Sequence, residues 1–148
     1  MFDITKTYPV NGFRLCMDEM SGDISGRAVS PLVKGEIAFH GVGELLFKME
    51  QVFNRAGYPQ AFQEKRSFSG NREQKGNYQG IPEAVRDAES ICSEKGKIFY
   101  LDIVVKSRRN ASWQGVIYDE MGMLAGEFQG ELELLQYIEN IYREKKEC

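Results

Sequence analysis

Apolar residues recur three and four positions apart along residues 42–53, which is the spacing of one face of a helix. Gly57 and Pro59 follow this stripe, and both residue types commonly end helices. The same spacing along 134–142 predicts a C-terminal helix. Burial of one large apolar side chain contributes roughly 1.5–3 kcal/mol, so both helices are expected to pack against a sheet or another helix.

A middle helix is predicted over 82–95. Its apolar residues keep the helical spacing, while Pro82 suits the first helical position and Gly96 the position just after the end. The stretch 69–80 before it is polar and rich in glycine, which is typical of a mobile surface loop. We do not interpret it as a domain linker, because each half of the chain would be small for an independent core.

Runs of alternating or β-branched apolar residues predict the strands. The strongest run is 98–105, which is apolar enough for both of its faces to be covered. A short edge strand is predicted within 61–68. The other predicted strands are 13–18, 24–29, 32–39, 113–118 and 124–128.

The segment 39–53 recurs at 128–142, with an offset of 89 residues. The same offset aligns Gly26 with Gly115, so the repeat extends beyond one helix. Each half then reads as β-β-β-α. The identical pairs within the two segments are Phe39/Phe128, Gly41/Gly130, Glu44/Glu133, Leu45/Leu134, Leu46/Leu135 and Glu50/Glu139.

These elements predict an α+β fold in a single domain, 1–148. We expect a mostly antiparallel sheet of five to seven strands with the helices on one face. A pseudo-twofold axis is expected to relate the halves, 13–56 and 98–144, which the loop and the middle helix join. The repeated glutamates are interpreted as solvated or capping charges.

Composition narrows the class of protein. With 42% apolar and 28% charged residues the chain is typical of a globular protein, and no apolar run is long enough to span a membrane. A net charge of -3 argues against a general affinity for nucleic acid. Cys16, Cys92 and Cys148 lack disulfide or zinc spacing, and no secretory signal is evident, so we expect a cytoplasmic protein with reduced thiols.

The candidate site is the string 106–115, KSRRNASWQG, between two predicted strands. Its arginines could hold phosphate or carboxylate, its tryptophan could stack on a planar group, and its amides offer paired donors and acceptors. Equally, it could be a plain hairpin with a core tryptophan and solvated arginines. The first half has no such polar cluster at 20–26. The candidate ligand-binding residues are Arg108, Arg109, Asn110, Trp113, Gln114 and Arg66.

At this string the chain resembles a group of small, functionally uncharacterised cytosolic proteins of Gram-positive bacteria and their mobile elements. The shared pattern is R-x-N-A-S/T-W-Q-G, followed by a phenylalanine that enters an L-E-L-L helix. In the first half, ELLFKME at 44–50, GYPQ at 57–60 and RSF at 66–68 are similar to the same group. The resemblance covers 39–68 and 98–142. The resemblance implies a stand-alone cytosolic protein, and it supplies no known activity that could be transferred to this chain.

The leading functional hypothesis is a non-catalytic binding or regulatory module that recognises a protein partner or a small anionic ligand through 106–115. No nucleophile–base pair, phosphate-binding loop or metal-ligand spacing is present, so no catalytic residue, cofactor or metal is expected. One alternative is a small hydrolase-type enzyme that uses Asp102, Asp119 and Glu120. Another is a single-stranded nucleic-acid binder that stacks bases on Trp113. A homodimer formed through a free sheet edge is also open.

Overall fold

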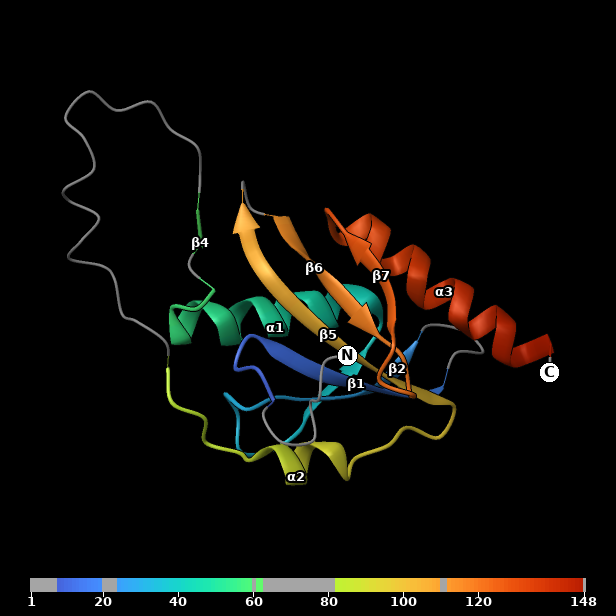
Figure 1. Ribbon diagram of the computed structural model, residues 1–148, viewed down its shortest axis with the longest axis horizontal. Coiled ribbons are helices and arrows are strands. Elements are labelled where there is room, and N and C mark those ends of the chain that lie inside the picture. The colour runs from blue at the N-terminus through green and yellow to red at the C-terminus, as the bar shows by residue number, and fades with distance from the viewer. Residues whose placement is uncertain (1–7, 20–23, 60, 63–81, 110–111, 148) are drawn as a thin grey trace.

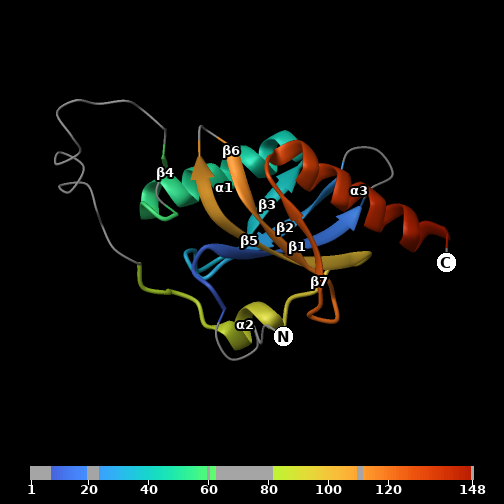
Figure 2. The same ribbon diagram turned by 45° about the horizontal axis from the view of Figure 1, so that its top comes forward.

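The computed structural model describes residues 8–19, 24–59, 61–62, 82–109 and 112–147. These residues form seven strands and three helices, with the two long helices on one face of a sheet and the short helix on the other (Figures 1 and 2). The strands are β1 (Gly12–Glu19), β2 (Ser25–Val29), β3 (Ile37–His40), β4 (Ala61–Phe62), β5 (Phe99–Arg109), β6 (Ser112–Tyr118) and β7 (Leu124–Phe128). The helices are α1 (Val42–Ala56), α2 (Ala88–Cys92) and α3 (Glu131–Glu147).

Six strands form one antiparallel sheet in the order β3-β2-β1-β5-β6-β7. The two-residue β4 lies outside this path and pairs with β5 in parallel. The predicted α+β fold with a mostly antiparallel sheet is therefore confirmed. The order places β1 and β5, which are far apart in sequence, side by side at the centre of the sheet.

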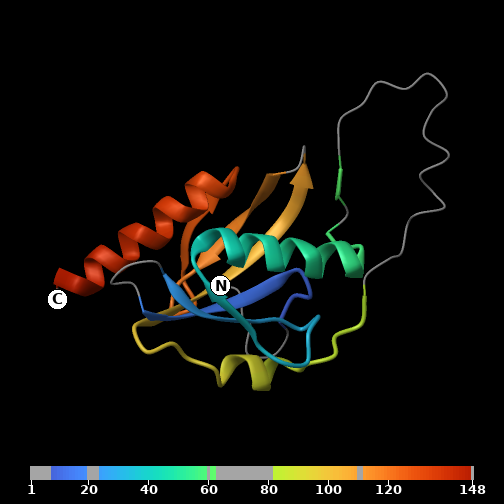
Figure 3. The same ribbon diagram turned by 180° about the vertical axis from the view of Figure 1, so that it is seen from behind.

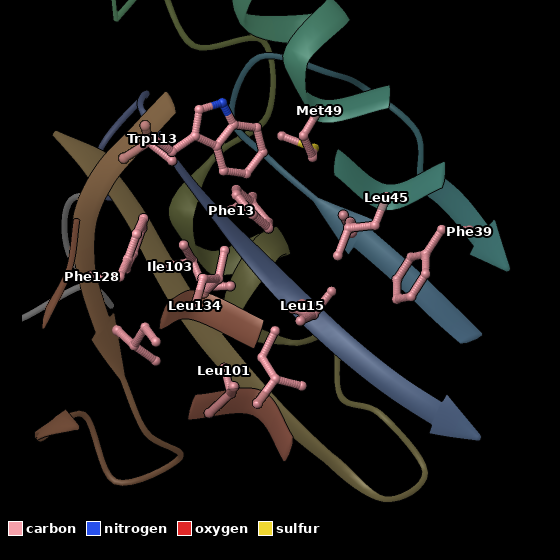
Figure 4. Packing of buried hydrophobic residues seen from close by; sticks show 14 of the residues in the cluster. Phe13, Leu15, Phe39, Leu45, Met49, Leu101, Ile103, Trp113, Phe128 and Leu134 are labelled. Carbon is pink, nitrogen blue, oxygen red and sulfur yellow. The ribbon is translucent and has the colours of Figure 1, made fainter. Parts of the chain in front are cut away.

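The main core lies between the sheet and the two long helices. Alternate residues of β1 and β5, such as Phe13 and Ile103, point toward α1 and α3 because successive strand residues face opposite sides. Leu45 and Met49 of α1 and Leu134 of α3 pack onto them, and all are almost completely buried (Figure 4). Seen from behind, both helices cover this face (Figure 3). The two predicted apolar stripes are thus the surfaces that contact the sheet.

The α1 helix ends as the sequence predicts. Gly57 has a left-handed backbone, with φ of 70°, and its N–H donates to the carbonyl groups of Phe53 and Asn54. Glycine adopts this conformation without the steric penalty of a side chain.

The short α2 lies on the opposite face of the sheet (Figure 2), so only the two long helices share one face. A small second cluster joins Ile91 of α2 to Val29 of β2 and to Tyr8. Cys16 is buried on this face, where burial raises the pKa of its thiol to about 11, and Cys92 packs beside the cluster. Neither of these two cysteines forms a disulfide.

The helix predicted over 82–95 is wrong in its bounds, since only Ala88–Cys92 is helical. Before it, the N–H of Val85 donates to the carbonyl of Pro31, and this contact attaches the segment to a distant loop. Asp87 then caps the helix by accepting from the N–H of Ser90. Gly96 serves close packing instead of a helix end, because a side chain there would collide with the backbone of Met17 and Phe99.

One strand prediction needs correction, and another is tested only in part. Of the predicted strand 32–39, only the end belongs to the sheet, since β3 begins at Ile37. The chain turns after Ser30, whose carbonyl accepts from the N–H of Val33. Of the run 61–68, β4 is confirmed, and the remainder lies outside the described residues together with the predicted loop 69–80.

The two halves agree in one detail of register. Gly26 pairs with Phe39 in the first half, and Gly115 pairs with Phe128 in the second, at the same offset of 89 residues. A side chain at either glycine would collide with the neighbouring strand. The pseudo-twofold relation between the complete halves stays a prediction. In the described part of the chain, no helix is both long and apolar enough to cross a membrane.

Candidate functional site

The string 106–115 forms the adjoining ends of β5 and β6. A bulge between Val105 and Ser107 shifts the pairing, so that Arg108 pairs with Trp113 and Ser107 with Gln114. Because neighbouring residues of a strand face opposite sides, these two pairs lie on opposite faces of the sheet. The extra residue of the bulge lies in β5, so the bulge turns Arg108 toward α1, the side on which the regular alternation of β6 already places Trp113.

Trp113 is a core residue with one polar edge. Only 2% of its surface is exposed, and its ring packs edge-on against Phe13 and Phe53, at centroid distances of 6.2 and 5.6 Å (Figure 4). Its Nε1–H donates to Oε1 of Glu50 over 2.7 Å, which satisfies the one polar group of the ring. In this structure the tryptophan therefore offers its faces to the core and not to solvent.

Arg108 is equally buried, at 3% exposure, and bonds to groups of α1 and of the chain after it. Its Nε–H donates to the carbonyl of Pro59 over 2.6 Å, and Nη1 donates to Oδ1 of Asn54 over 2.7 Å and to Oε2 of Glu50 over 3.1 Å. Burial lowers the pKa of the guanidinium, and the carboxylate of Glu50 opposes that shift.

Glu50 is the residue that joins this site, and the sequence interpretation missed its role. One carboxylate oxygen accepts from Trp113 and the other from Arg108, while 40% of the side chain remains exposed. The interpretation as a solvated or capping charge is wrong for Glu50. Its place on α1, one turn before Phe53 and beside the core stripe, was the available signal, since such a position can reach a donor on the sheet.

Glu44 and Glu133 do act as capping charges. Oε1 of Glu44 accepts from the N–H of His40 over 2.8 Å, and Oε1 of Glu133 accepts from the N–H of Gln129 over 2.6 Å. The same device therefore begins both long helices.

Gln114 lies on the face of the sheet opposite to Trp113. Its Oε1 accepts from the hydroxyl of Ser107 over 2.7 Å, and its Nε2 donates to the carbonyl of Gln129 over 3.4 Å. The neighbouring Ser112 donates its hydroxyl to Oε1 of Glu131, in the first turn of α3, over 2.9 Å. The hairpin end is thus attached to α1 through Glu50 and to α3 through Ser112.

The structure gathers only part of the predicted site. Arg108 and Trp113 come together through Glu50, and Gln114 is separated from them by the sheet. Arg109 pairs with Phe62 of β4 and Ser112 of β6, which fixes its backbone. Asn110 and Arg66 lie outside the described residues.

A second buried polar cluster lies at the centre of the sheet, on the face of α2. Nε and Nη2 of Arg14 donate to the two oxygens of Asp102, each over 2.9 Å, and the hydroxyl of Tyr8 donates to Oδ1 over 2.6 Å. The guanidinium also lies 4.0 Å from the ring centroid of Tyr100. Burial, with Asp102 close by, raises the pKa of Tyr8 well above its usual value.

Two of the three carboxylates named for an enzyme have structural partners. Asp102 is held by Arg14 and Tyr8, and Oδ1 of Asp119 accepts from the N–H groups of Met121 and Met123 in the β6–β7 turn. Among the residues that the structure describes, no group of three or more histidine, cysteine, aspartate or glutamate side chains is placed to hold a metal ion.

Comparisons with protein-family models, with curated proteins and with solved structures find no match to this chain.

Proposed function

We propose that this protein is a non-catalytic binding module that recognises a protein partner through the hairpin end, residues 106–115, and the helix turns beside it. One observation carries the proposal: large apolar side chains are exposed to solvent on the two helices that bond to the hairpin end. Phe47 of α1 is 63% exposed and Leu132 of α3 is 80% exposed. Exposed apolar side chains that lie together with polar groups around them are typical of protein interfaces.

Phe47 and Leu132 belong to the two helices that bond to the hairpin end. Phe47 lies one helical turn before Glu50, which bonds to Trp113, and Leu132 follows Glu131, which bonds to Ser112. The first turns of α1 and α3 lie side by side in all three ribbon views (Figures 1–3). A partner that contacts the hairpin end would therefore meet both helices.

The same contacts favour a protein over the other candidate ligands. Arg108 already faces the carboxylate of Glu50, so an anion would have to replace an existing ion pair. Nucleic-acid bases would need an open face of Trp113, and that ring is buried in the core. An enzyme would need free carboxylates, and Asp102 and Asp119 support the fold instead.

The proposed module is cytoplasmic, in agreement with two buried or partly buried cysteines outside any disulfide. A homodimer remains one form in which it could act, and the test below reports it directly.

The test compares the wild-type protein with the double variant Phe47→Ser/Leu132→Ser. Val85→Ser is the matched control, because Val85 is also an exposed apolar residue, at 49%, but belongs to the segment before α2. Each tagged protein is used to capture partners from a Gram-positive bacterial lysate, and the captured complexes are analysed by cross-linking and native mass spectrometry. Circular dichroism confirms that every variant is folded.

We expect the wild type and Val85→Ser to retain the same partner, with cross-links to 106–115, α1 and α3. The double variant should retain at least tenfold less of it. Equal capture by all three proteins would contradict the proposed surface. A small-molecule adduct that disappears in Arg109→Ala would instead support the ligand-binding hypothesis.

A further inference from the structure

The stretch 110–142 contains no lysine, arginine or histidine. It forms β6, β7 and most of α3, and it includes the edge strand at one end of the sheet. All of its charged side chains are acidic: Asp119, Glu120, Glu127, Glu131, Glu133 and Glu139. This quarter of the molecule therefore has a uniformly negative charge, although the chain as a whole is nearly neutral.

Large apolar side chains are exposed along the same edge. Met121 in the β6–β7 turn is 79% exposed, Met123 is 54% exposed and Leu124, the first residue of β7, is 57% exposed. Further along the strand, Ala125 and Glu127 are also exposed. Figure 1 shows β7 as the last strand on its side of the sheet, with β6 as its neighbour.

At the opposite edge of the sheet, a lysine of the neighbouring helix bonds to the backbone of the edge strand, and β7 differs in this contact. At the β3 edge, Nζ of Lys48 donates to the carbonyl of Ala38, so a side chain of α1 occupies a backbone group of the strand. The bond of Glu44 to the N–H of His40 is common to both edges, because Glu133 accepts from the N–H of Gln129 after β7. At the position of α3 that corresponds to Lys48, the chain has Tyr137, whose ring lies against Gly126 of β7. Lys48 therefore bonds to the backbone of the β3 edge, whereas the aligned position beside the β7 edge carries a tyrosine.

We propose that the edge of β7, together with Met121, Met123 and Leu124, docks an extended, basic segment of another protein, which adds a strand to the sheet. Main-chain hydrogen bonds to β7 supply the register, the three apolar side chains receive alternate apolar residues of the segment, and its lysines or arginines face the acidic side chains. This interface is separate from the hairpin end, and it gives the protein a second binding surface.

The negative charge around β7 distinguishes between three possible partners of this edge: a second copy of the chain, a nucleic acid and a basic segment of another protein. A second copy of β7 would bring Glu127 of each chain into the same short antiparallel pairing, and like charges close together on paired strands are destabilising. Phosphates of a nucleic acid would be repelled by the acidic side chains. A positively charged strand meets neither obstacle.

The test begins with a display library of random peptides of about twelve residues, selected on the full-length wild-type protein. We expect the selected sequences to alternate lysine or arginine with apolar residues. One such peptide is then titrated into isotopically labelled protein, and its amide shifts are expected to centre on 124–128. A peptide with glutamate in place of every lysine and arginine serves as the ligand control.

Two variants of the edge, Glu127→Lys and Leu124→Ser, are each expected to weaken peptide binding at least tenfold. Phe47→Ser is the matched control and should bind normally, because Phe47 belongs to the surface beside the hairpin end. Selected peptides without basic residues, shifts away from β7, or equal binding by Glu127→Lys would overturn the proposal. A dimer that Glu127→Lys disrupts would also overturn it, because the occupant would then be a second copy. The Phe47 variants test the surface beside the hairpin end, and the Glu127 and Leu124 variants test the β7 edge. Failure of one proposal can therefore be told from failure of the other.

Discussion

The two long helices carry a glutamate at matching positions, and the two side chains have different surroundings. Glu50 of α1 accepts from Trp113 and Arg108 of the β5–β6 hairpin. Glu139 of α3 is 65% exposed and lies 3.8 Å from Arg143, on its own helix. The same residue in the same place of the helix pattern thus joins helix to sheet in one half and faces solvent in the other.

The predicted pseudo-twofold relation attributes the difference to the residues that the two glutamates face. The offset of 89 residues aligns Trp113 with Ile24, which is partly buried against the core and has no polar group on its side chain. A tryptophan at this position provides both a large apolar surface and an N–H donor, whereas an isoleucine provides only the apolar surface. The repeated sequence pattern therefore gives Glu50 and Glu139 the same position on their helices, and the contacts that each side chain makes depend on which residues lie opposite to it.

The largest expected effect is that of Trp113→Ala. Removal of a buried tryptophan leaves a large cavity, and we expect a loss of about 3–5 kcal/mol of unfolding free energy, measured by urea denaturation followed by circular dichroism. Ile24→Ala, at the aligned position, should cost clearly less because Ile24 is only partly buried. A Trp113→Ala protein that stays as stable as the wild type and loses binding would show that the tryptophan is a ligand platform.

The second prediction compares Glu50→Ala with Glu139→Ala. The first leaves the buried Arg108 without its counter-charge and Trp113 without its acceptor, so we expect a loss of about 2–3 kcal/mol. The second removes one exposed ion pair within a helix and should change stability by less than about 0.5 kcal/mol. Thermal and urea unfolding of both variants give the comparison, and similar losses would refute the asymmetry between the halves.

A double-mutant cycle isolates the bond between Glu50 and Trp113. Trp113→Phe keeps an aromatic ring in the core but removes the N–H donor, and Glu50→Ala removes the acceptor. We expect a coupling free energy of about 1 kcal/mol between the two substitutions, because the residues are in direct contact. Strict additivity would mean that the tryptophan is held by packing alone.

Features that depend on local periodicity were predictable from the sequence. The stripes of α1 and α3 and the end of α1 at Gly57 follow from rules that act over a few residues, so their prediction was confirmed. The length of α2 was not predictable in this way, because the contact of Val85 with Pro31 connects parts of the chain that only the fold brings together.

The candidate site shows the same limit. The composition of 106–115 identified Arg108 and Trp113 as unusual, but it did not show whether they face solvent or the core. The bulge after Val105 decides which face Arg108 takes, and the partner Glu50 lies 63 residues away from Trp113 in sequence. Long-range contacts of this kind leave no periodic signal in a single sequence.

The smallest expected effect concerns the positions at which the two halves agree. Glu44 and Glu133 each accept from a backbone N–H just before their helix, over 2.8 and 2.6 Å. Replacing either with alanine should cost about 0.5–1 kcal/mol of unfolding free energy, since both bonds are local and exposed. The two losses should differ by no more than about 0.5 kcal/mol, because only Glu44 has an additional exposed ion pair, with Lys48. Glu44→Gln and Glu133→Gln are the matched controls, because the amide oxygen can still accept. A larger difference, measured by urea unfolding, would mean that the capping bonds at the two helix starts differ, whereas a difference within this limit confines the larger asymmetry to Glu50 and the strands that it meets.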